Sequence, residues 1–496
     1  MARASLASLA LVALSWAMPA RAQTWCLEHT ECNPGWLCVA ASCRPAQDPR
    51  IVKLFPVAVS PFHDLTPDGR GESMVRQAPE ILRGFLSASL FFDAVDGRRT
   101  PGGAAIEGWV PSSIDWGAWL DTGAYGLVKG TVERVPGDEL VLDLRFYVIE
   151  SGVRVALKHD RQLVTGETLR RALGRWADDL LVELTGRPGV FGSRIAFAKR
   201  LGSGPKQVGH VGLDGLDEVA VTANTAINML PAWTRDAAHV AYTSYADGNP
   251  DLWMDGKKLS AYESLNTGAA FSPDGTELAI TLSKDGNAEI YVLDAQSGEV
   301  KRRLTRSPSI DSSPSWSPDG QRITFLSDRG GSPQIYVMDK DGGNLTRLPQ
   351  AGGYNTSPEW SPVGSVIAYN TMVTSTRFDL FAVDPDSGHT WRLTSGSGNN
   401  EEPSWSPDGR YIVFTSTRDG GVKRLWIMSA DGRLATMITK EAGEYFTPAW
   451  SPLPPEDPPP PPTDAPESGH VFDVDGQPPG PVYSAGPNGG RGSLAE

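Results

Sequence analysis

The chain has 496 residues, of which 40% are hydrophobic and 21% charged, and its formal net charge at pH 7 is -14. A chain of this length exceeds what one hydrophobic core normally organises, so we expect two or three domains. The negative charge repels phosphate backbones, and no run of Lys and Arg interleaved with aromatic residues offers a local exception. Nucleic acid is therefore excluded as a partner class.

Residues 1–22 have the pattern of a secretory signal peptide. Arg3 precedes an apolar run over 6–16, and the stretch closes on the small residues of Ala20-Arg21-Ala22. The alternative is a membrane anchor, which needs roughly 18 apolar residues, more than this run contains. Cys26 does not follow the Leu-small-small tripeptide of a lipoprotein. We therefore predict an exported protein with a cleaved signal peptide and no direct insertion into a membrane.

All four cysteines lie in a Cys-rich segment over 23–49: Cys26, Cys32, Cys38 and Cys43. Thiols in an oxidising compartment form pairs, so two disulfides are expected. Four cysteines allow three connectivities, and the sequence does not select one of them. A zinc site is the rival interpretation, but the spacing lacks the paired Cys-x2-Cys knuckles of zinc ribbons. We predict disulfides and no metal.

The segment over 50–188 predicts an α/β domain, a mixed sheet with two helices. Apolar residues that recur every three or four positions indicate the helices, and Val- and Ile-rich or alternating stretches indicate the strands. In chain order the expected elements are a strand at 51–59, a helix at 72–91, strands at 125–135, 140–149 and 154–164, and a helix at 168–184. No glycine loop suited to phosphate binding occurs here, which favours a scaffold or docking module.

One motif recurs over 190–452, an aromatic residue followed by Ser-Pro-Asp-Gly or a close variant. Its period of 38 to 45 residues is typical of the blades of a β-propeller. Pro presets φ at the first corner of the turn, and Gly accepts the positive φ that a Cβ atom disfavours. Six copies predict six blades, and their aromatic residues are Trp233, Phe271, Trp316, Trp360, Trp405 and Trp450.

The last copy of the motif has no outer strands of its own, because a proline run follows Trp450. Three unassigned strands lie ahead of the first copy, at 194–199, 206–213 and 218–222. Pairing them with the innermost strand of the sixth blade closes the ring and leaves no exposed edge inside it. The Trp-Asp and Gly-His dipeptides of WD40 repeats do not recur, so we exclude that class.

The exported α/β domain joined to six such repeats resembles the TolB family over about 51–452. The junction from Leu184-Thr185-Gly186 to Arg194-Ile195-Ala196-Phe197 is similar to the family's hinge, and Phe446 to Pro452 is similar to its C-terminal end. The resemblance implies a periplasmic location and a propeller whose mouth binds the peptidoglycan-associated lipoprotein Pal. It also implies a mature N-terminus that signals to TolA, and a role in outer-membrane integrity and constriction at division.

Two segments depart from the family pattern. The Cys-rich segment separates the mature N-terminus from the first strand, where the family has a short lead, and this bears on the contact with TolA. The tail over 453–496 is rich in Pro, Gly, Ser and Asp, a composition that cannot bury a core, and we expect it to be disordered. We expect a monomer.

The loops ahead of the innermost strands are the candidate partner site. If the Ser-Pro-Asp-Gly turns occupy one face of the ring, these loops occupy the other, and in TolB the equivalent loops touch Pal. Their short polar side chains suit hydrogen bonds to a partner, although such residues often only cap turns. The candidate Pal-facing residues are Leu265, Asn266, Thr267, Asp311, Ser312, Asn355, Thr356, Asn400, Glu401, Tyr445 and Phe446.

No catalytic residues or cofactor are predicted. The chain has no Gly-x-Ser-x-Gly elbow and no His-Glu-x-x-His motif, and its seven histidines are scattered without ligand spacing. The prediction is a binding protein and not an enzyme. The competing function is a paralogous periplasmic propeller that binds a glycan or peptide ligand outside the Tol-Pal system.

Overall fold

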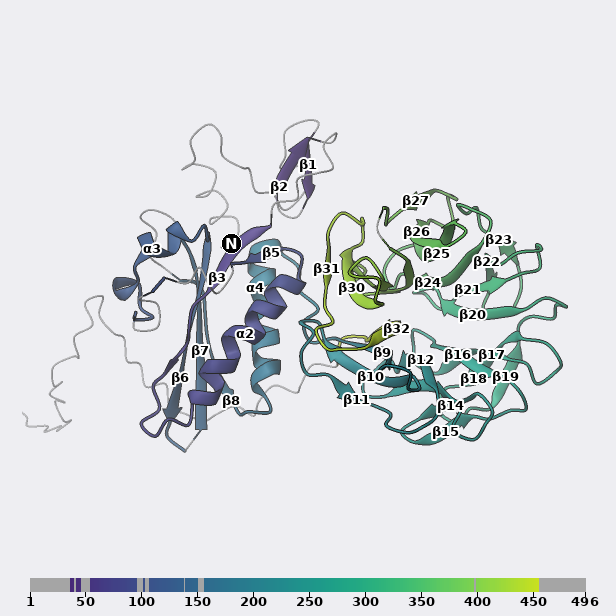
Figure 1. Cartoon of the computed structure of the whole chain (residues 1–496), viewed down its shortest axis with the longest axis horizontal. Coiled ribbons are helices and arrows are strands. Elements are labelled where there is room, and N and C mark those ends of the chain that lie inside the picture. Colours follow the sequence, from purple (N-terminus) through teal and green to yellow (C-terminus); the bar gives the residue numbers. More distant parts are fainter. Residues whose placement is uncertain are drawn as a thin grey trace, which may run out of the picture. The chain divides into compact units, whose positions relative to one another are not determined.

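The computed structural model describes residues 36–39, 42–45, 54–95, 101–102, 107–137, 139–149, 156–396 and 398–454 (Figure 1). The predicted signal peptide, Cys26, Cys32 and the tail beyond residue 454 lie outside the described residues. Strands β1 (Trp36–Val39) and β2 (Ser42–Pro45) form an antiparallel hairpin whose register places Cys38 opposite Cys43. The two disulfides stay a prediction.

The N-terminal region is built on a mixed sheet in the order β5-β3-β6-β7-β8, with β4 paired to β6. Strand β3 runs parallel to β5 and β6, whereas β6, β7 and β8 are antiparallel to one another. The strands are β3 (Phe55–Val59), β4 (His63–Asp64), β5 (Phe92–Ala94), β6 (Gly126–Val135), β7 (Glu139–Val148) and β8 (Ala156–Val164). This arrangement confirms the predicted α/β fold.

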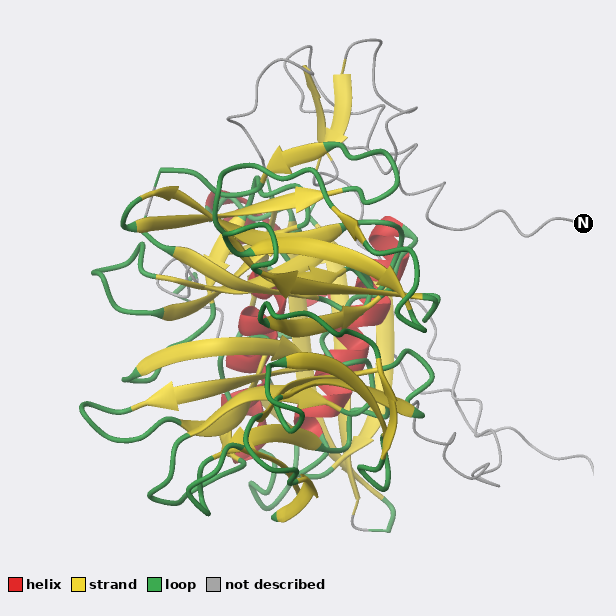
Figure 2. Cartoon of the chain, turned by 90° about the vertical axis from the view of Figure 1, so that its right-hand side faces the viewer, coloured by secondary structure: helices red, strands yellow, loops and turns green. Residues whose placement is uncertain are grey.

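Helices α2 (Glu72–Ala88) and α4 (Leu169–Thr185) pack against this sheet through the apolar stripes seen in the sequence. Leu82, Phe85, Leu173 and Trp176 are all buried in one core with side chains of the sheet. Figure 2 shows helices only behind the strands of the propeller, and every helix that the structure describes lies before residue 186.

A third helix, α3 (Trp116–Asp121), was not predicted, and a 3-10 turn, η3 (Pro111–Ser113), precedes it. With only six residues, α3 is too short to show a helical period, and its sequence signal is the N-cap Asp115, which accepts from the backbone N–H of Ala118 at 3.1 Å. Trp119 packs with Leu127 and Tyr147 in a second, smaller core.

The propeller consists of six four-stranded antiparallel blades, as predicted (Figure 1). Their innermost strands contact one another in sequence around a closed ring. Blades 1 to 3 are β12 (Asn228–Trp233), β13 (Val240–Ser244), β14 (Asp251–Met254) and β15 (Lys257–Ser260); β16 (Asn266–Phe271), β17 (Glu277–Leu282), β18 (Glu289–Asp294) and β19 (Val300–Arg303); and β20 (Asp311–Trp316), β21 (Arg322–Ser327), β22 (Gln334–Asp339) and β23 (Thr346–Arg347). Blades 4 and 5 are β24 (Asn355–Trp360), β25 (Ile367–Thr374), β26 (Arg377–Val383) and β27 (Thr390–Arg392); and β28 (Asn400–Trp405), β29 (Tyr411–Ser416), β30 (Arg424–Ser429) and β31 (Ala435–Met437).

Blade 6 joins distant parts of the chain, which confirms the predicted closure. Its strands are β32 (Glu444–Trp450), β9 (Arg194–Arg200), β10 (Gln207–Gly212) and β11 (Val219–Ala220), in the order β11-β10-β9-β32. At the end of the pairing, the Ser451 hydroxyl accepts from the N–H of Arg194 at 2.9 Å, and the N–H of Ser451 donates to the carbonyl of Arg194 at 2.8 Å. These two bonds continue the ladder across the seam.

The aromatic residue of each motif lies between neighbouring blades. The indole N–H of Trp316 donates to the carbonyl of Ala270 in the preceding blade at 3.0 Å, and Trp233 bonds the carbonyl of Ala449 in the same way at 3.0 Å. In the turn that follows, Asp319 accepts from the Ser317 hydroxyl at 2.6 Å and from the N–H of Gln321 at 3.0 Å. The Asp of the motif is thus a turn residue, as predicted.

The ring has two faces, which we name from the chain path. The turn face carries the Ser-Pro-Asp-Gly turns, and the front face carries the residues just before each innermost strand. The N-terminal region contacts the turn face, where Tyr411 donates its hydroxyl to the carbonyl of Ser89 at 2.7 Å and Arg170 forms an ion pair with Asp214. Neither of these two contacts involves the front face.

Replacing Trp316 with Ala should lower the free energy of unfolding by about 3 to 5 kcal/mol, because it empties a buried site between two blades. Urea denaturation followed by circular dichroism measures the change. Trp391→Ala is the matched control, since Trp391 is only half-buried on the outermost strand of blade 4, and it should cost clearly less. Equal losses in the two variants would contradict the inter-blade role of Trp316.

Candidate functional site

Each innermost strand has a buried side chain at its front-face end, five residues before the motif's aromatic residue. In the first five blades this side chain is an amide or a carboxylate that bonds within the ring. Asn266, for example, accepts from the Ser260 hydroxyl at 2.9 Å and donates to the carbonyl of Tyr262 at 2.7 Å. The six residues are Asn228, Asn266, Asp311, Asn355, Asn400 and Tyr445.

This burial divides the predicted Pal-facing residues into two groups. Asn266, Asp311, Asn355 and Asn400 are 0% exposed, so their side chains shape the loops from within and do not reach a partner. Tyr445 and Phe446 are also buried, and Tyr445 donates its hydroxyl to Glu218 at 3.1 Å. The side chains that are partly accessible at the front face are Leu265, Thr267, Ser312, Thr356 and Glu401.

A β-bulge follows the buried residue in every innermost strand. The residue two positions on has a positive φ in all six blades, and the register shifts beside it. Only one of the six is a glycine, and left-handed backbone costs other residues about 1 kcal/mol or more. Bulges re-aim the neighbouring side chains, so the front end of the ring is shaped by repeated backbone strain. The six residues are Leu230, Gly268, Ser313, Ser357, Glu402 and Thr447.

Four consecutive blades present an apolar side chain just before the buried residue. Ile227, Ile310 and Tyr354 are 42%, 51% and 38% exposed, and Leu265 is partly exposed. Backbone bonds hold these positions, as in the 3.0 Å bond from the N–H of Tyr245 to the carbonyl of Ile227. Of these four residues, only Leu265 was predicted from the sequence to face a partner. The sequence signal that could have found the other three is their shared position in the repeat, one residue before the buried Asn or Asp.

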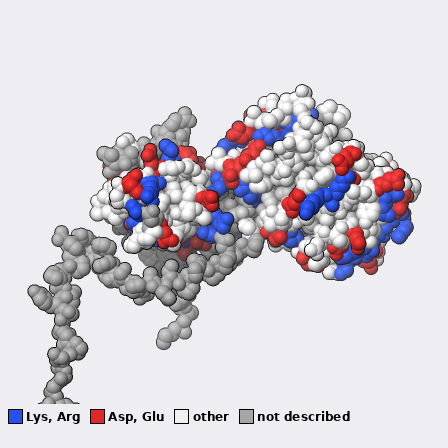
Figure 3. Space-filling model, turned by 90° about the horizontal axis from the view of Figure 1, so that it is seen from below, with Lys and Arg blue, Asp and Glu red and all other residues white. Residues whose placement is uncertain are grey.

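Blades 5 and 6 present charge at the front face instead. The Phe446 ring lies beneath three cations, with the ammonium of Lys206 3.9 Å from the ring centroid and Arg200 and Lys423 each at 5.4 Å. Arg200 donates to Glu444 at 3.0 Å, and Lys423 pairs with Glu401 at 2.8 Å. Elsewhere on the propeller, blue and red patches adjoin on the side seen in Figure 3. Arg200, Lys206 and Lys423 were not predicted from the sequence to belong to the partner site. Their neighbour Glu401 was.

Glu359 links the innermost strands of blades 4 and 5. Its carboxylate accepts from the N–H of Trp405 at 3.0 Å and from the Ser404 hydroxyl at 2.9 Å. A serine does the same work in the flanking blades, where Ser315 accepts from the N–H of Trp360 and Ser404 from that of Trp450. Burial raises the pKa of Glu359 from 4.5 to about 7, against the opposing effect of these two hydrogen bonds.

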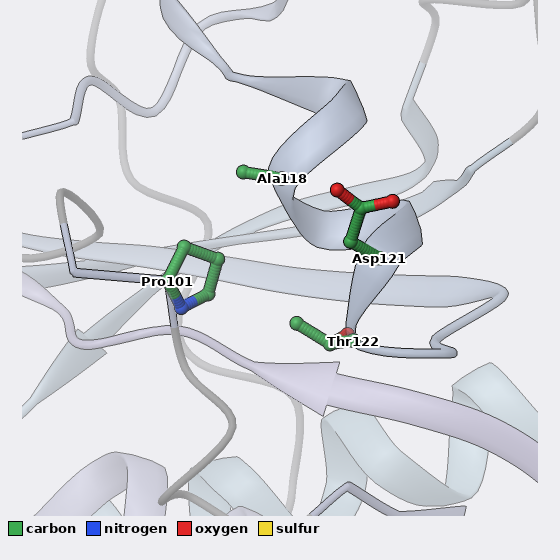
Figure 4. A pocket seen from close by; sticks show the side chains of 4 residues that line it. All are labelled: Pro101, Ala118, Asp121 and Thr122. Carbon is green, nitrogen blue, oxygen red and sulfur yellow. The ribbon is translucent and has the colours of Figure 1, made fainter.

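An open hollow of about 290 Å³ lies beside α3 in the N-terminal region (Figure 4). Its lining residues are Pro101, Ala118, Asp121 and Thr122. One carboxylate and one hydroxyl at its border do not converge as the polar groups of a small-molecule site do. The described residues contain no group of three or more His, Cys, Asp and Glu side chains placed to hold a metal ion. Within the same residues, no helix combines the length and apolarity needed to cross a membrane.

The family model of the TolB beta propeller domain matches residues 182–454. The Tol-Pal system protein TolB of Anaeromyxobacter dehalogenans (strain 2CP-C) is 38% identical over 258 residues, which are 51% of this chain and 57% of that protein. The TolB of Dinoroseobacter shibae is 32% identical over 323 residues, 61% of this chain and 66% of that protein. The chain thus matches little more than half the length of the first of these relatives.

The crystal structure of TolB from Acinetobacter baumannii superposes on this chain with a TM-score of 0.67 and 28% sequence identity. The superposition covers 81% of this chain and 97% of that structure. The similarity therefore extends over the N-terminal region as well as the propeller.

Glu359→Gln should remove a pH dependence of stability. The raised pKa of Glu359 means that its stabilising contribution is fully present below pH 4.5 and is lost as the pH rises through about 7. Glutamine can accept the same two hydrogen bonds and does not ionise. Relative to wild type, the variant should therefore gain up to about 3 kcal/mol between pH 4.5 and 8. Urea denaturation at both pH values measures this gain, with the exposed Glu299→Gln as control. A gain that does not change with pH would refute the assignment.

Proposed function

The chain belongs to the TolB β-propeller family, and from this membership we propose that it is a periplasmic, non-enzymatic binding component of a Tol-Pal envelope system. Its partner is a Pal-like lipoprotein, bound at the front face of the ring. Through that contact it supports outer-membrane integrity and constriction at division. The names of the relatives as Tol-Pal system proteins support the assignment to the system.

The observation that carries the proposal is the exposed apolar arc of Ile227, Leu265, Ile310 and Tyr354. Adjacent blades supply these residues, each from the same position of the repeat, so they face solvent on one side of the ring. Exposed apolar side chains gathered on one face mark a protein-interaction surface more often than scattered single ones do. Aliphatic and aromatic side chains also form the centre of most protein interfaces.

The polar residues of the same loops suit the border of such an interface. Thr267, Ser312 and Thr356 follow the buried amide or carboxylate in blades 2 to 4 and are partly exposed. Hydroxyl groups at the border of an interface donate and accept hydrogen bonds directly or through water. The N-terminal region contacts only the turn face in the bonds described above, so a folded partner has room at the front face.

Ile310→Ser combined with Tyr354→Ser should weaken binding to the soluble domain of the organism's Pal-like lipoprotein by about tenfold or more. Both changes remove exposed apolar area, so folding should be little affected. Calorimetric titration gives the affinity, and thermal unfolding checks that the variant is folded.

Val363→Ser combined with Leu345→Ser is the matched control, because these residues are 56% and 43% exposed and lie on the turn face. This variant should bind as wild type does. Equal affinity of all three proteins would place the contact elsewhere. A folded wild-type protein that does not bind the lipoprotein would favour a paralogue with a glycan or peptide ligand.

A further inference from the structure

Lys206 and Lys423 occupy equivalent positions in blades 6 and 5, just before the third strand of each blade. In both, the backbone carbonyl accepts from the N–H of a buried residue of the next innermost strand, Asn228 at 2.9 Å and Tyr445 at 3.1 Å. The corresponding residues in blades 1 to 3 are Pro250, Ala288 and Pro333, which make the same bond. The fold therefore needs only the backbone carbonyl at this position, and the shared hydrogen bond does not require a lysine side chain.

Phe446 is a second departure from the repeat at the same place. The residue that follows the buried one is Met229 in blade 1, Thr267, Ser312 or Thr356 in blades 2 to 4, and Glu401 in blade 5, and none of these is aromatic. In blade 6 it is Phe446, whose ring lies within 6 Å of the charged ends of Arg200, Lys206 and Lys423. The aromatic ring holds these cations together by cation–π attraction at the front face.

Lys206 differs from the other two cations in its bonding. Arg200 pairs with Glu444 and Lys423 with Glu401, whereas the ammonium of Lys206 makes neither a hydrogen bond nor an ion pair within the described part of the chain. Its ammonium has three N–H donors and rests half-buried on the ring. An arriving acceptor would therefore meet a cation that forms no direct ion pair with a described residue.

The carboxylate of Glu402, which also lies near Lys206, already accepts hydrogen bonds from other residues. Glu402 accepts from the N–H of Thr447 at 2.8 Å and from the Thr415 hydroxyl at 3.1 Å. Burial lowers the pKa of Lys206 most; Glu402 and Glu444 oppose this shift, and Lys423 and Arg200 add to it. A carboxylate bound beside the ammonium would act in the opposite direction and raise that pKa.

We propose that Lys206, flanked by Arg200 and Lys423 around the Phe446 ring, forms a carboxylate-binding site for an acidic side chain of the protein that docks on the front face. A carboxylate accepts charge-assisted hydrogen bonds from an ammonium, and the ring fixes where that ammonium lies. With the apolar arc in blades 1 to 4, the face recognises an acidic group next to an apolar surface. Only the identity of the partner rests on the proposed function.

The first test is titration of the soluble domain of the organism's Pal-like lipoprotein into the mature wild-type protein and Lys206→Gln. The variant should bind about tenfold more weakly, and its affinity should depend less steeply on salt concentration. Lys340→Gln is the control, because Lys340 is exposed on the turn face, and it should bind as wild type does. Unchanged affinity and salt dependence in Lys206→Gln would overturn the carboxylate site while leaving the proposed function intact.

A second measurement does not need the lipoprotein. Tetraglutamate is titrated into the mature protein with carbon-13-methylated lysines, and the pH titration of each lysine signal is followed by NMR. The peptide should shift the Lys206 signal saturably and raise the pKa of Lys206, with no such change at Lys340. Lysine signals that move alike, or a Lys206 signal that does not move, would refute the site. A saturable response at Lys206 in a protein that does not bind the lipoprotein would refute only the proposed function.

Discussion

The pairing of β32 with β9 is the interaction on which the rest of the propeller depends. Without it, β32 and β9 would expose unpaired backbone groups within blade 6, and the wedge residues at the seam would lose their partners. The same pairing builds part of the front face, because Arg200 and Glu444, 244 positions apart in the sequence, form an ion pair across it. Phe446 comes from one side of this seam and Lys206 from the other, so ring closure assembles the proposed carboxylate site.

Comparison of the six repeats separates residues that serve the fold from residues that are available for recognition. The buried amide or carboxylate, the bulge and the wedge recur because each satisfies a backbone or packing need that every blade shares. The lysines at 206 and 423 have no counterpart in blades 1 to 3, phenylalanine at 446 has none in the other blades, and no shared need accounts for these residues. Glu359 is a different kind of exception, since it keeps the bonding role of the serines in the flanking blades but adds a titratable group.

Much of this architecture could be predicted from the sequence because it is periodic. The spacing of the aromatic residues gave the number of blades, and the missing outer strands after Trp450 gave the closure. The helix α3 was missed since six residues do not complete two turns of a helical period. The choice of candidate residues in the loops ahead of the innermost strands relied on polarity, and polarity does not distinguish exposed from buried side chains. Asn266, Asp311, Asn355 and Asn400 look like exposed binding groups in the sequence, yet hydrogen bonds inside the ring bury them. Whether a side chain points into a blade or out of it depends on the bulge, which no local pattern indicates.

The composition of blade 6 also sets an order of events during synthesis. A chain grows from its N-terminus, and domains fold as their residues become available. Five blades and the strands β9, β10 and β11 can form before β32 has been made, but the ring stays open until then. Until β32 pairs with β9, Arg200 and Lys206 therefore lack the Phe446 ring that they contact in the complete propeller. A chain that ended before β32 would carry the apolar arc and all three cations but lack the Phe446 ring that holds the cations together, so full recognition of an acidic partner is restricted to molecules whose propeller is complete.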